Sequence, residues 1–348
     1  MNYHLNEDVN SSQGERSDVI GWNVYADNPA DASALMTRAL IDDYNALREA
    51  CTQSQDREAE KIGLLGKYTL NGTATLVFDN VDLWWWDKED GNPYNDYLGN
   101  GSYWNYPGEN VLWTNGAEYT FKAYFPKGEV QLQAGSGADR LIAVYDTEES
   151  QYDFMVAHRK LGAYEENPVS LDMHHALAAL KFDFLLADDD ITDRLHSCWL
   201  ENGSQDGFYT TSTLNFDQDI VWPKSTAVPP GSPVYYWKPS EPLEINGSKA
   251  VDAYSTYATD ENGSVFTANE GWLLVIPQSS DKYGALKLCF RTTAGGDNVY
   301  RLDLPAYDFI AGYRYTYHVK MTATEVKVGL TVADWNERKS SYEIDFNE

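Results

Sequence analysis

The amino-acid sequence predicts an all-β protein with two tandem β-sandwich domains and minor helical insertions. Three observations support this prediction: short runs that alternate between apolar and polar residues, turn signals between the runs, and 43% hydrophobic residues with 14% aromatic ones. Alternation is the pattern of a strand with one buried face. A chain of 348 residues is long enough for about two ordinary domains.

The dipeptide Asn-Gly separates these runs. It suits the tight hairpin turn in which both central residues take positive φ. Most of these sites also read Asn-Gly-Ser or Asn-Gly-Thr, an acceptor sequence for N-glycosylation, but the recurring glycine favours the turn interpretation. The asparagines are Asn71, Asn100, Asn115, Asn202, Asn246 and Asn262.

Alternating runs predict half-buried strands from one end of the chain to the other. The first is carried by Ile20, Trp22 and Val24, and others lie at residues 118–125 and 313–321. Two more runs contain Leu180, Phe182 and Phe184, and Val326, Val328, Leu330 and Val332.

The stretch GWLLVIPQSS, residues 271–280, contains an apolar run without alternation. The run is too short to cross a membrane. It therefore predicts a strand buried on both faces and placed centrally in the second sandwich. Pro277 should end this strand, because proline cannot donate to the hydrogen-bond ladder.

Two segments depart from the strand period. Leu40, Tyr44, Leu47 and Cys51 recur at helical spacing and predict a short helix over residues 41–52. A second helical turn is predicted for HHALAA, residues 174–179.

The stretch AYEENPVS, residues 163–170, has the composition of a linker. It divides the chain into an N-terminal sandwich at 1–164 and a C-terminal sandwich at 165–348.

The charge balance excludes some classes of partner. Twenty-six basic residues against 54 acidic ones give a net charge of −28, which repels nucleic-acid phosphates and anionic lipid head groups. No secretion signal stands at residue 1, but a mature exported protein would look the same. Cys51, Cys198 and Cys289 are widely spaced and predict free thiols.

The sequence offers no support for enzyme chemistry. It contains no nucleophile elbow and no phosphate-binding loop, and its histidines lack the spacing of a zinc helix. We expect no catalytic residue, cofactor or metal site. A glycoside hydrolase is the weakest alternative, since it needs two converging carboxyl groups and many acidic residues always offer some pair.

The most unusual composition lies at residues 82–113, where aromatic residues crowd around turns. Exposed aromatic rings can stack on sugars or anchor a protein partner, whereas buried ones belong to the core. In a strand, Trp84 and Trp86 share one face and Trp85 takes the other. The candidate ligand-binding aromatics are Trp84, Trp85, Trp86, Tyr103 and Trp104.

A series of motifs runs through most of the chain in one order. They are TRA at 37–39, YWNYPGENVLWTNGAEYTFKAYFP at 103–126, QYDFMVA at 151–157, HALAALKFDF at 175–184, LLVIPQ at 273–278, AGYRYTYHVKM at 311–321 and VADWN at 332–336. In this series the chain resembles the fimbrillin-like (Mfa-like) family, which comprises subunits of type V pili and related surface adhesins of Gram-negative anaerobes.

The resemblance implies two transthyretin-like sandwiches, export as a lipoprotein to the outer membrane or a cell-surface fimbria, and assembly with other pilus subunits by strand exchange. In pilins of this family an arginine-specific protease removes an N-terminal strand. Arg38 in TRA matches the cleavage position, so Ile20, Trp22 and Val24 would form the removable strand. The lipid-bearing cysteine would then precede residue 1.

The C-terminal segment SYEIDFNE supplies a candidate donor strand, in which Tyr342, Ile344 and Phe346 alternate with acidic residues. A removed edge strand leaves unpaired backbone groups and an apolar groove, and an incoming strand satisfies both.

The leading hypothesis is thus a non-enzymatic fimbrial or adhesin subunit whose partners are other pilus subunits. Proteins or glycans of host or bacterial surfaces are further candidate partners, and nucleic acid is not. The alternative is a carbohydrate-binding surface module that uses the aromatic cluster. At the level of single residues, Arg38 could also be an ordinary surface arginine, the first strand a permanent one, and the C-terminal segment the last strand of its own sandwich.

Overall fold

The computed structural model describes residues 19–26, 41, 44–53, 59–86, 103–107, 110–188, 191–204, 207–255, 258–259, 265–266, 271–322 and 325–335. Over these residues the chain forms strands and a single helix, α1 (Tyr44–Ala50). The predicted all-β class is confirmed. The predicted helix over 41–52 exists as α1, but Ile41 is not helical, the helix ends at Ala50, and Thr52 already belongs to a strand.

The N-terminal half is built on one eight-stranded sheet, which curls around its own core. Trp22 from one margin packs against Phe121 from the middle of the sheet and against Phe78 from near the opposite margin. The main path of this sheet runs in the order β1 (Trp22–Ala26), β10 (Val169–His175), β9 (Met155–Gly162), β6 (Glu118–Phe125), β3 (Ile62–Leu70), β4 (Thr73–Trp86) and β2 (Thr52–Gln53), with β5 (Tyr103–Asn105) on β4.

The C-terminal half is a sandwich of two sheets around a second core, in which Phe184 of one sheet meets Phe290 of the other. The first sheet contains β17 (Val251–Asp252), β11 (Ala178–Leu186), β25 (Tyr313–Met321) and β26 (Val326–Asp334), with β20 (Leu273–Val275) on β11. The second contains β19 (Val265–Phe266), β18 (Ala258–Thr259), β15 (Pro233–Pro239), β12 (Asp193–Asn202), β22 (Leu286–Thr292) and β23 (Tyr300–Asp303), with β16 (Leu243–Ile245) on β12.

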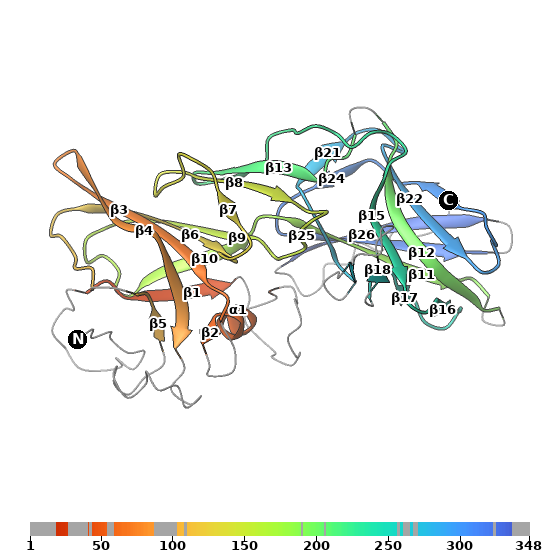
Figure 1. Ribbon diagram of the computed structural model, residues 1–348, viewed down its shortest axis with the longest axis horizontal. Coiled ribbons are helices and arrows are strands. Elements are labelled where there is room, and N and C mark those ends of the chain that lie inside the picture. The colour runs from red at the N-terminus through yellow and green to blue at the C-terminus, as the bar shows by residue number, and fades with distance from the viewer. Residues whose placement is uncertain are drawn as a thin grey trace.

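A third core joins the two halves at the waist of the molecule, where Figure 1 shows β8 and β13 between them. It is covered by a four-stranded sheet in the order β14 (Ile220–Val221), β13 (Thr211–Phe216), β8 (Leu141–Asp146) and β7 (Gln131–Leu132). A small pair, β21 (Gln278–Ser280) with β24 (Tyr307–Phe309), completes the fold.

Strand pairing crosses the predicted boundary between residues 164 and 165. β10 follows that boundary in sequence, yet it pairs with β1 and β9 of the N-terminal half. β8 and β13, one from each half, also pair. The division into domains at 1–164 and 165–348 stays a prediction, while the halves share a sheet and a core.

The predicted helical turn at 174–179 is wrong. β10 ends at His175 and β11 begins at Ala178, so the segment carries the chain from one sheet to the next in nearly continuous strand. Ala176 and Leu177 between them are fully buried in the waist core. Burial between two sheets therefore overrides the helical preference of alanine and leucine.

The apolar run within residues 271–280 forms a strand, β20, which stops before Pro277 as predicted. Its position differs from the prediction, because it pairs with β11 at the margin of its sheet. Leu273 and Val275 enter the C-terminal core, whereas Leu274 and Ile276 enter the waist core. Two separate cores thus explain why both faces of the run are apolar.

Candidate functional site: the N-terminal strand and the sheet margins

Strand β1 lies at a margin of the N-terminal sheet. It runs parallel to β10, with Trp22 opposite Val169 and Ala26 opposite Met173. Among the described residues, no other strand pairs with β1. Just before it, Val19 forms an isolated bridge with Leu112, and the Ile20 N–H donates to the carbonyl of Val111 at 3.0 Å. β1 is therefore held by one ladder and a short clasp.

The side chains of β1 and of Ile20 just before it fill an apolar slot. Ile20 and Val24 are fully buried, and Trp22 is 4% exposed. The Trp22 indole meets the rings of Phe78 and Phe121 edge-on, with centroids 5.4 and 4.9 Å away. Burying one such side chain contributes about 1.5–3 kcal/mol. The predicted removable strand is thus part of the N-terminal core.

The fit of Trp22 in this slot is imperfect. Its Nε1–H is buried and has no hydrogen-bond partner in the described structure. A buried donor without a partner costs about 1–3 kcal/mol. An apolar side chain of similar size in this slot would avoid that cost.

Asn167 secures the start of β1. Its Oδ1 accepts from the Gly21 N–H at 2.8 Å, and its Nδ2 donates to the Val19 carbonyl at 2.9 Å. The side-chain amide thereby imitates one residue of a pairing strand. The Val169 N–H donates to the Gly21 carbonyl at 2.8 Å beside it. The sequence analysis missed this contact, although Asn-Pro is a known turn signal within the predicted linker.

Near the opposite margin of the sheet, β2 and β5 pair only with the end of β4, and the rest of β4 carries a bulge and charged contacts. The register of β3 and β4 shifts between Leu64, which faces Val81, and Gly66, which faces Phe78. Asn80 sits in this bulge with φ of +53°. Bulges and charges on a margin strand oppose pairing with another chain.

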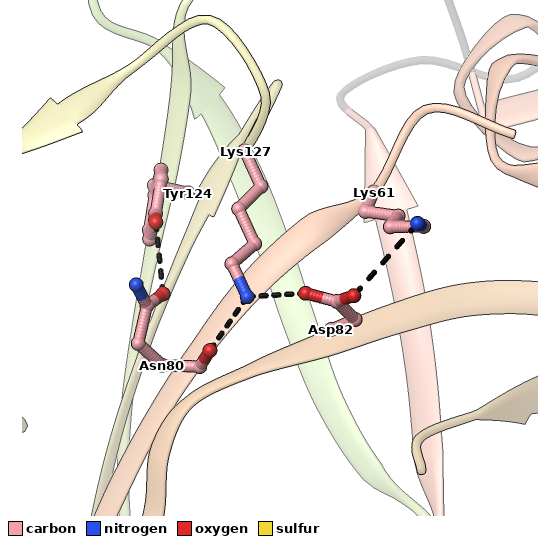
Figure 2. Close-up of polar contacts among 5 residues, drawn as sticks. All are labelled: Lys61, Asn80, Asp82, Tyr124 and Lys127. Atoms are coloured by element: carbon pink, nitrogen blue, oxygen red, sulfur yellow. Dashed lines mark hydrogen bonds and ion pairs between the residues drawn. The ribbon is translucent and has the colours of Figure 1, made fainter.

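Figure 2 shows the polar contacts that hold this bulge. The Lys127 ammonium donates to the Asn80 carbonyl at 2.6 Å and to the Asp82 carboxylate, which Lys61 approaches at 3.8 Å. The Tyr124 hydroxyl donates to Asn80 Oδ1 at 2.8 Å. Burial raises the pKa of Tyr124 to about 12, so this hydroxyl keeps its proton at neutral pH.

A sequence signal for the bulge exists. Buried positions in β4 switch from the even-numbered Phe78 to the odd-numbered Leu83 and Trp85, and the polar pair Asp79 and Asn80 lies at the switch. A strand without a bulge would keep one parity. The two margins therefore differ: the β4 margin is bulged and charged, whereas the β1 margin is apolar.

The predicted aromatic cluster lies at the end of β4 and in β5. Trp84 faces Asn105, Trp85 faces Trp104 and Trp86 faces Tyr103 across the strands. For Trp86 and Tyr103 the structure describes only the backbone pairing.

Trp85 and Trp104 are 2% and 3% exposed, and their rings pack edge-to-face with centroids 5.6 Å apart. Their faces are occupied by protein atoms, whereas Trp84 is half-buried. Ligand binding by these aromatics stays a prediction.

The remaining predicted residues lie outside the described part of the chain. These are Arg38 at the predicted cleavage position and Tyr342, Ile344 and Phe346 of the predicted donor strand.

The described residues contain neither a metal-binding cluster nor a membrane-spanning helix. No three histidine, cysteine, aspartate or glutamate side chains gather there in a way that could hold a metal ion. No helix in these ranges is both long and apolar enough to cross a membrane. The three cysteines are buried free thiols, as predicted.

The chain is similar to known proteins in sequence and in fold. The profile of a family described as fimbrillin-like matches residues 52–335. The comparison with curated proteins gives no match.

Among solved structures, a fimbrial protein from Bacteroides vulgatus is similar with a TM-score of 0.56 and 14% identity, over 91% of this chain and 99% of that one. A candidate cell adhesion protein from Bacteroides ovatus is similar with a TM-score of 0.51 and 16% identity, over 91% and 98% of the two chains. At these identities the structures establish a shared fold.

Proposed function

The chain belongs to the fimbrillin-like family, and from this premise we propose that it is a non-enzymatic cell-surface fimbrial subunit that assembles by exchange of strand β1. Related folds occur in a fimbrial protein and in a candidate adhesion protein of Bacteroides. In this proposal the subunit is exported as a lipoprotein to the outer membrane. Its partners are other pilus subunits, and the finished fimbria contacts surface proteins or glycans.

The observation that carries the proposal is the attachment of β1. This strand pairs along one edge, yet together with the preceding Ile20 it supplies Trp22 and Val24 to the core. Its loss would uncover the free edge of β10 and the slot between Phe78 and Phe121. Unpaired backbone beside an apolar slot is the recognition surface for an added strand.

The candidate donor is the segment 342–346 of a second copy. Tyr342, Ile344 and Phe346 lie on one face of an extended strand, so they can enter the slot together. Ile344 and Phe346 carry no polar atom that would be left without a partner there. This avoids the cost of the unpartnered Trp22 N–H.

Arg38 is the proposed processing position, between β1 and the helix α1. The test is limited digestion with an arginine-specific protease, followed by mass spectrometry and light scattering. We expect one early cut after Arg38 and growth into multimers. The Arg38→Ala variant should resist that cut and stay monomeric.

Two further variants separate cutting from assembly. Ile344→Asp places a charge on the apolar face of the donor, so it should be cut normally and remain a monomer. Glu343→Ala changes the opposite face and should still assemble. Cutting of the unmodified chain after Arg38 without any increase in size would sink the proposal.

A further inference from the structure

A buried aspartate–histidine pair lies at the waist, where two distant segments of the chain meet. His175 donates from Nδ1 to Asp153 Oδ1 at 2.9 Å, and the two side chains are 1% and 2% exposed. The other carboxylate oxygen, Oδ2, accepts from the backbone N–H of Ile41 at 2.9 Å. Asp153 thus holds the backbone at Ile41, which lies between β1 and α1 in the sequence.

The other side of His175 holds the beginning of the C-terminal tail. The Trp335 indole stacks on the imidazole with centroids 4.0 Å apart and planes inclined by 12°. The Trp335 backbone N–H donates to the Gly312 carbonyl at 2.7 Å, and the Arg314 guanidinium lies 5.0 Å from the indole ring centroid. Trp335 itself is 4% exposed.

These contacts form an unbroken series from Ile41 through Asp153 and His175 to Trp335. A carboxylate buried this deeply needs its donors, because removing one leaves charge without compensation. The bond to Asp153 in turn fixes the plane of the imidazole on which the indole stacks. A change at either end of the series should therefore alter the other end.

We propose that Asp153 and His175 form a latch that couples the attachment of Ile41 to the docking of Trp335. Ile41 lies just after Arg38, and Trp335 just before the segment 336–348. The use of the latch rests on the proposed strand exchange: a subunit that still carries its N-terminal segment keeps Trp335 docked, and release of that segment loosens Ile41 and thereby Trp335. The coupling itself is a property of the uncut monomer.

Coupling between two sites is reciprocal and typically amounts to a factor of about 5 to 150. Loosening Ile41 should therefore increase undocking of Trp335, and removing Trp335 should loosen Ile41 by the same factor. We expect about a tenfold effect in each direction.

The first arm of the experiment uses Ile41→Pro in the full chain, which removes the N–H that binds Asp153. Ile41→Ala is the matched control, because it deletes buried side-chain atoms and keeps the N–H. The readout is trypsin cleavage at Arg338 and Lys339, which lie just beyond Trp335. A protease binds several residues on each side of the bond it cuts, so Trp335 must undock first.

Two variants at His175 test the path. His175→Asn keeps a donor for Asp153 but loses the stacking ring, and His175→Phe keeps the ring but loses the donor. In each background the added effect of Ile41→Pro on tail cleavage should fall from about tenfold to about one, since the link is already broken.

The second arm measures the reverse direction and does not depend on the folding of the proline variant. Trp335→Ala should speed hydrogen exchange at the Ile41 amide about tenfold, and Trp335→Phe should have a smaller effect. Unchanged exchange at Ile41 in Trp335→Ala overturns the proposal. So does equal tail cleavage in Ile41→Pro and Ile41→Ala. Neither readout involves assembly, so a failure here is distinct from a failure of strand exchange.

Discussion

Strands β1 and β11 occupy corresponding places in the two halves of the molecule. Each opens its half, and each runs parallel to a later strand, β10 for β1 and β25 for β11. They differ at the other edge. β11 also pairs with β17 and β20, whereas the described structure gives β1 no second partner strand. The same local pairing therefore belongs to a strand paired on both edges in one half and on one edge in the other, which is the difference that the proposed exchange uses.

Connectivity increases this difference. β11 continues from β10 with only Ala176 and Leu177 between them, and both are buried at the waist. On the free edge of β20, the Gln151 amide pairs with the Leu274 backbone through contacts of 3.0 and 2.7 Å. β11 cannot leave without opening three ladders and two cores. β1 can leave by opening one ladder, the short clasp before it and one core.

The largest expected effect is the loss of unfolding free energy caused by core substitutions, and this loss should differ between the two strands. Phe182 of β11 is fully buried and stacks on Tyr317 at 5.2 Å, so Phe182→Ala should lower the free energy of unfolding by about 3–5 kcal/mol. Trp22→Ala should cost less, because a chain that gives up β1 locally limits the loss. Urea denaturation measures both. Equal losses would show that β1 is as integral as β11.

Lys122 should give the next largest effect, at the junction of the halves. This fully buried lysine on β6 donates to the Asp217 carbonyl and lies 4.9 Å from the centre of the Phe216 ring. Burial lowers its pKa to about 8, although Asp217 opposes this. The unfolded chain then binds more protons than the folded one from about pH 8 to the usual lysine value near 10.4.

Stability should therefore rise with pH across that interval, by about 3 kcal/mol at most. The difference in unfolding free energy between the wild-type chain and Lys122→Met isolates this group from other titrations. A difference that stays constant from pH 7.5 to 10 would refute the expected titration of Lys122.

Asn167→Ala should have a smaller and more local effect. It removes both side-chain bonds at the start of β1, which together contribute about 1–2 kcal/mol to holding the strand. We expect amide exchange in β1 to become about tenfold faster while exchange in β11 stays the same.

A matched control for Asn167 lies elsewhere in the fold. The Asn246 side chain also accepts backbone N–H groups, from Ser248 and Lys249, in an exposed turn. Asn246→Ala should leave exchange in β1 unchanged. Faster exchange in both variants would contradict a specific role for Asn167.

The smallest effect concerns His318, which binds β25 to β11. Its Nδ1 lies 2.7 Å from Asp183 Oδ2, and this hydrogen bond raises the pKa of His318. Because the pKa of His318 is higher in the folded chain, its protonation stabilises the fold. This contribution is complete below the pKa of the unfolded chain, about 6.5, and is lost as the pH rises through the pKa of the folded chain.

Because this histidine is partly exposed, the gain at pH 5.5 over pH 8.5 should be only a few tenths of a kcal/mol. The measurement is the difference in unfolding free energy between the wild-type chain and His318→Gln, determined at each of the two pH values. A gain of opposite sign would contradict the role of the Asp183 bond.

Most strands could be predicted from the sequence because alternation reports a half-buried surface directly. Residues 313–321 coincide with β25, and Asn71 with Gly72 forms the predicted turn with both φ angles positive. The failures lie where long-range contacts override local preference. HHALAA at 174–179 has helical residues but passes between two sheets, and the β4 bulge depends on Lys127 from another loop.

The sequence by itself determined the all-β class, the apolar faces of the strands and the motif series that marks the family, because these follow from local residue order. Only the tertiary structure decided which strand has a free edge, that two cores enclose residues 273–276, and that Asp153 and His175 bring Ile41 to Trp335. Such features depend on pairing and contacts between residues distant in sequence. A local pattern fixes which face of a strand is buried, but not which neighbour buries it.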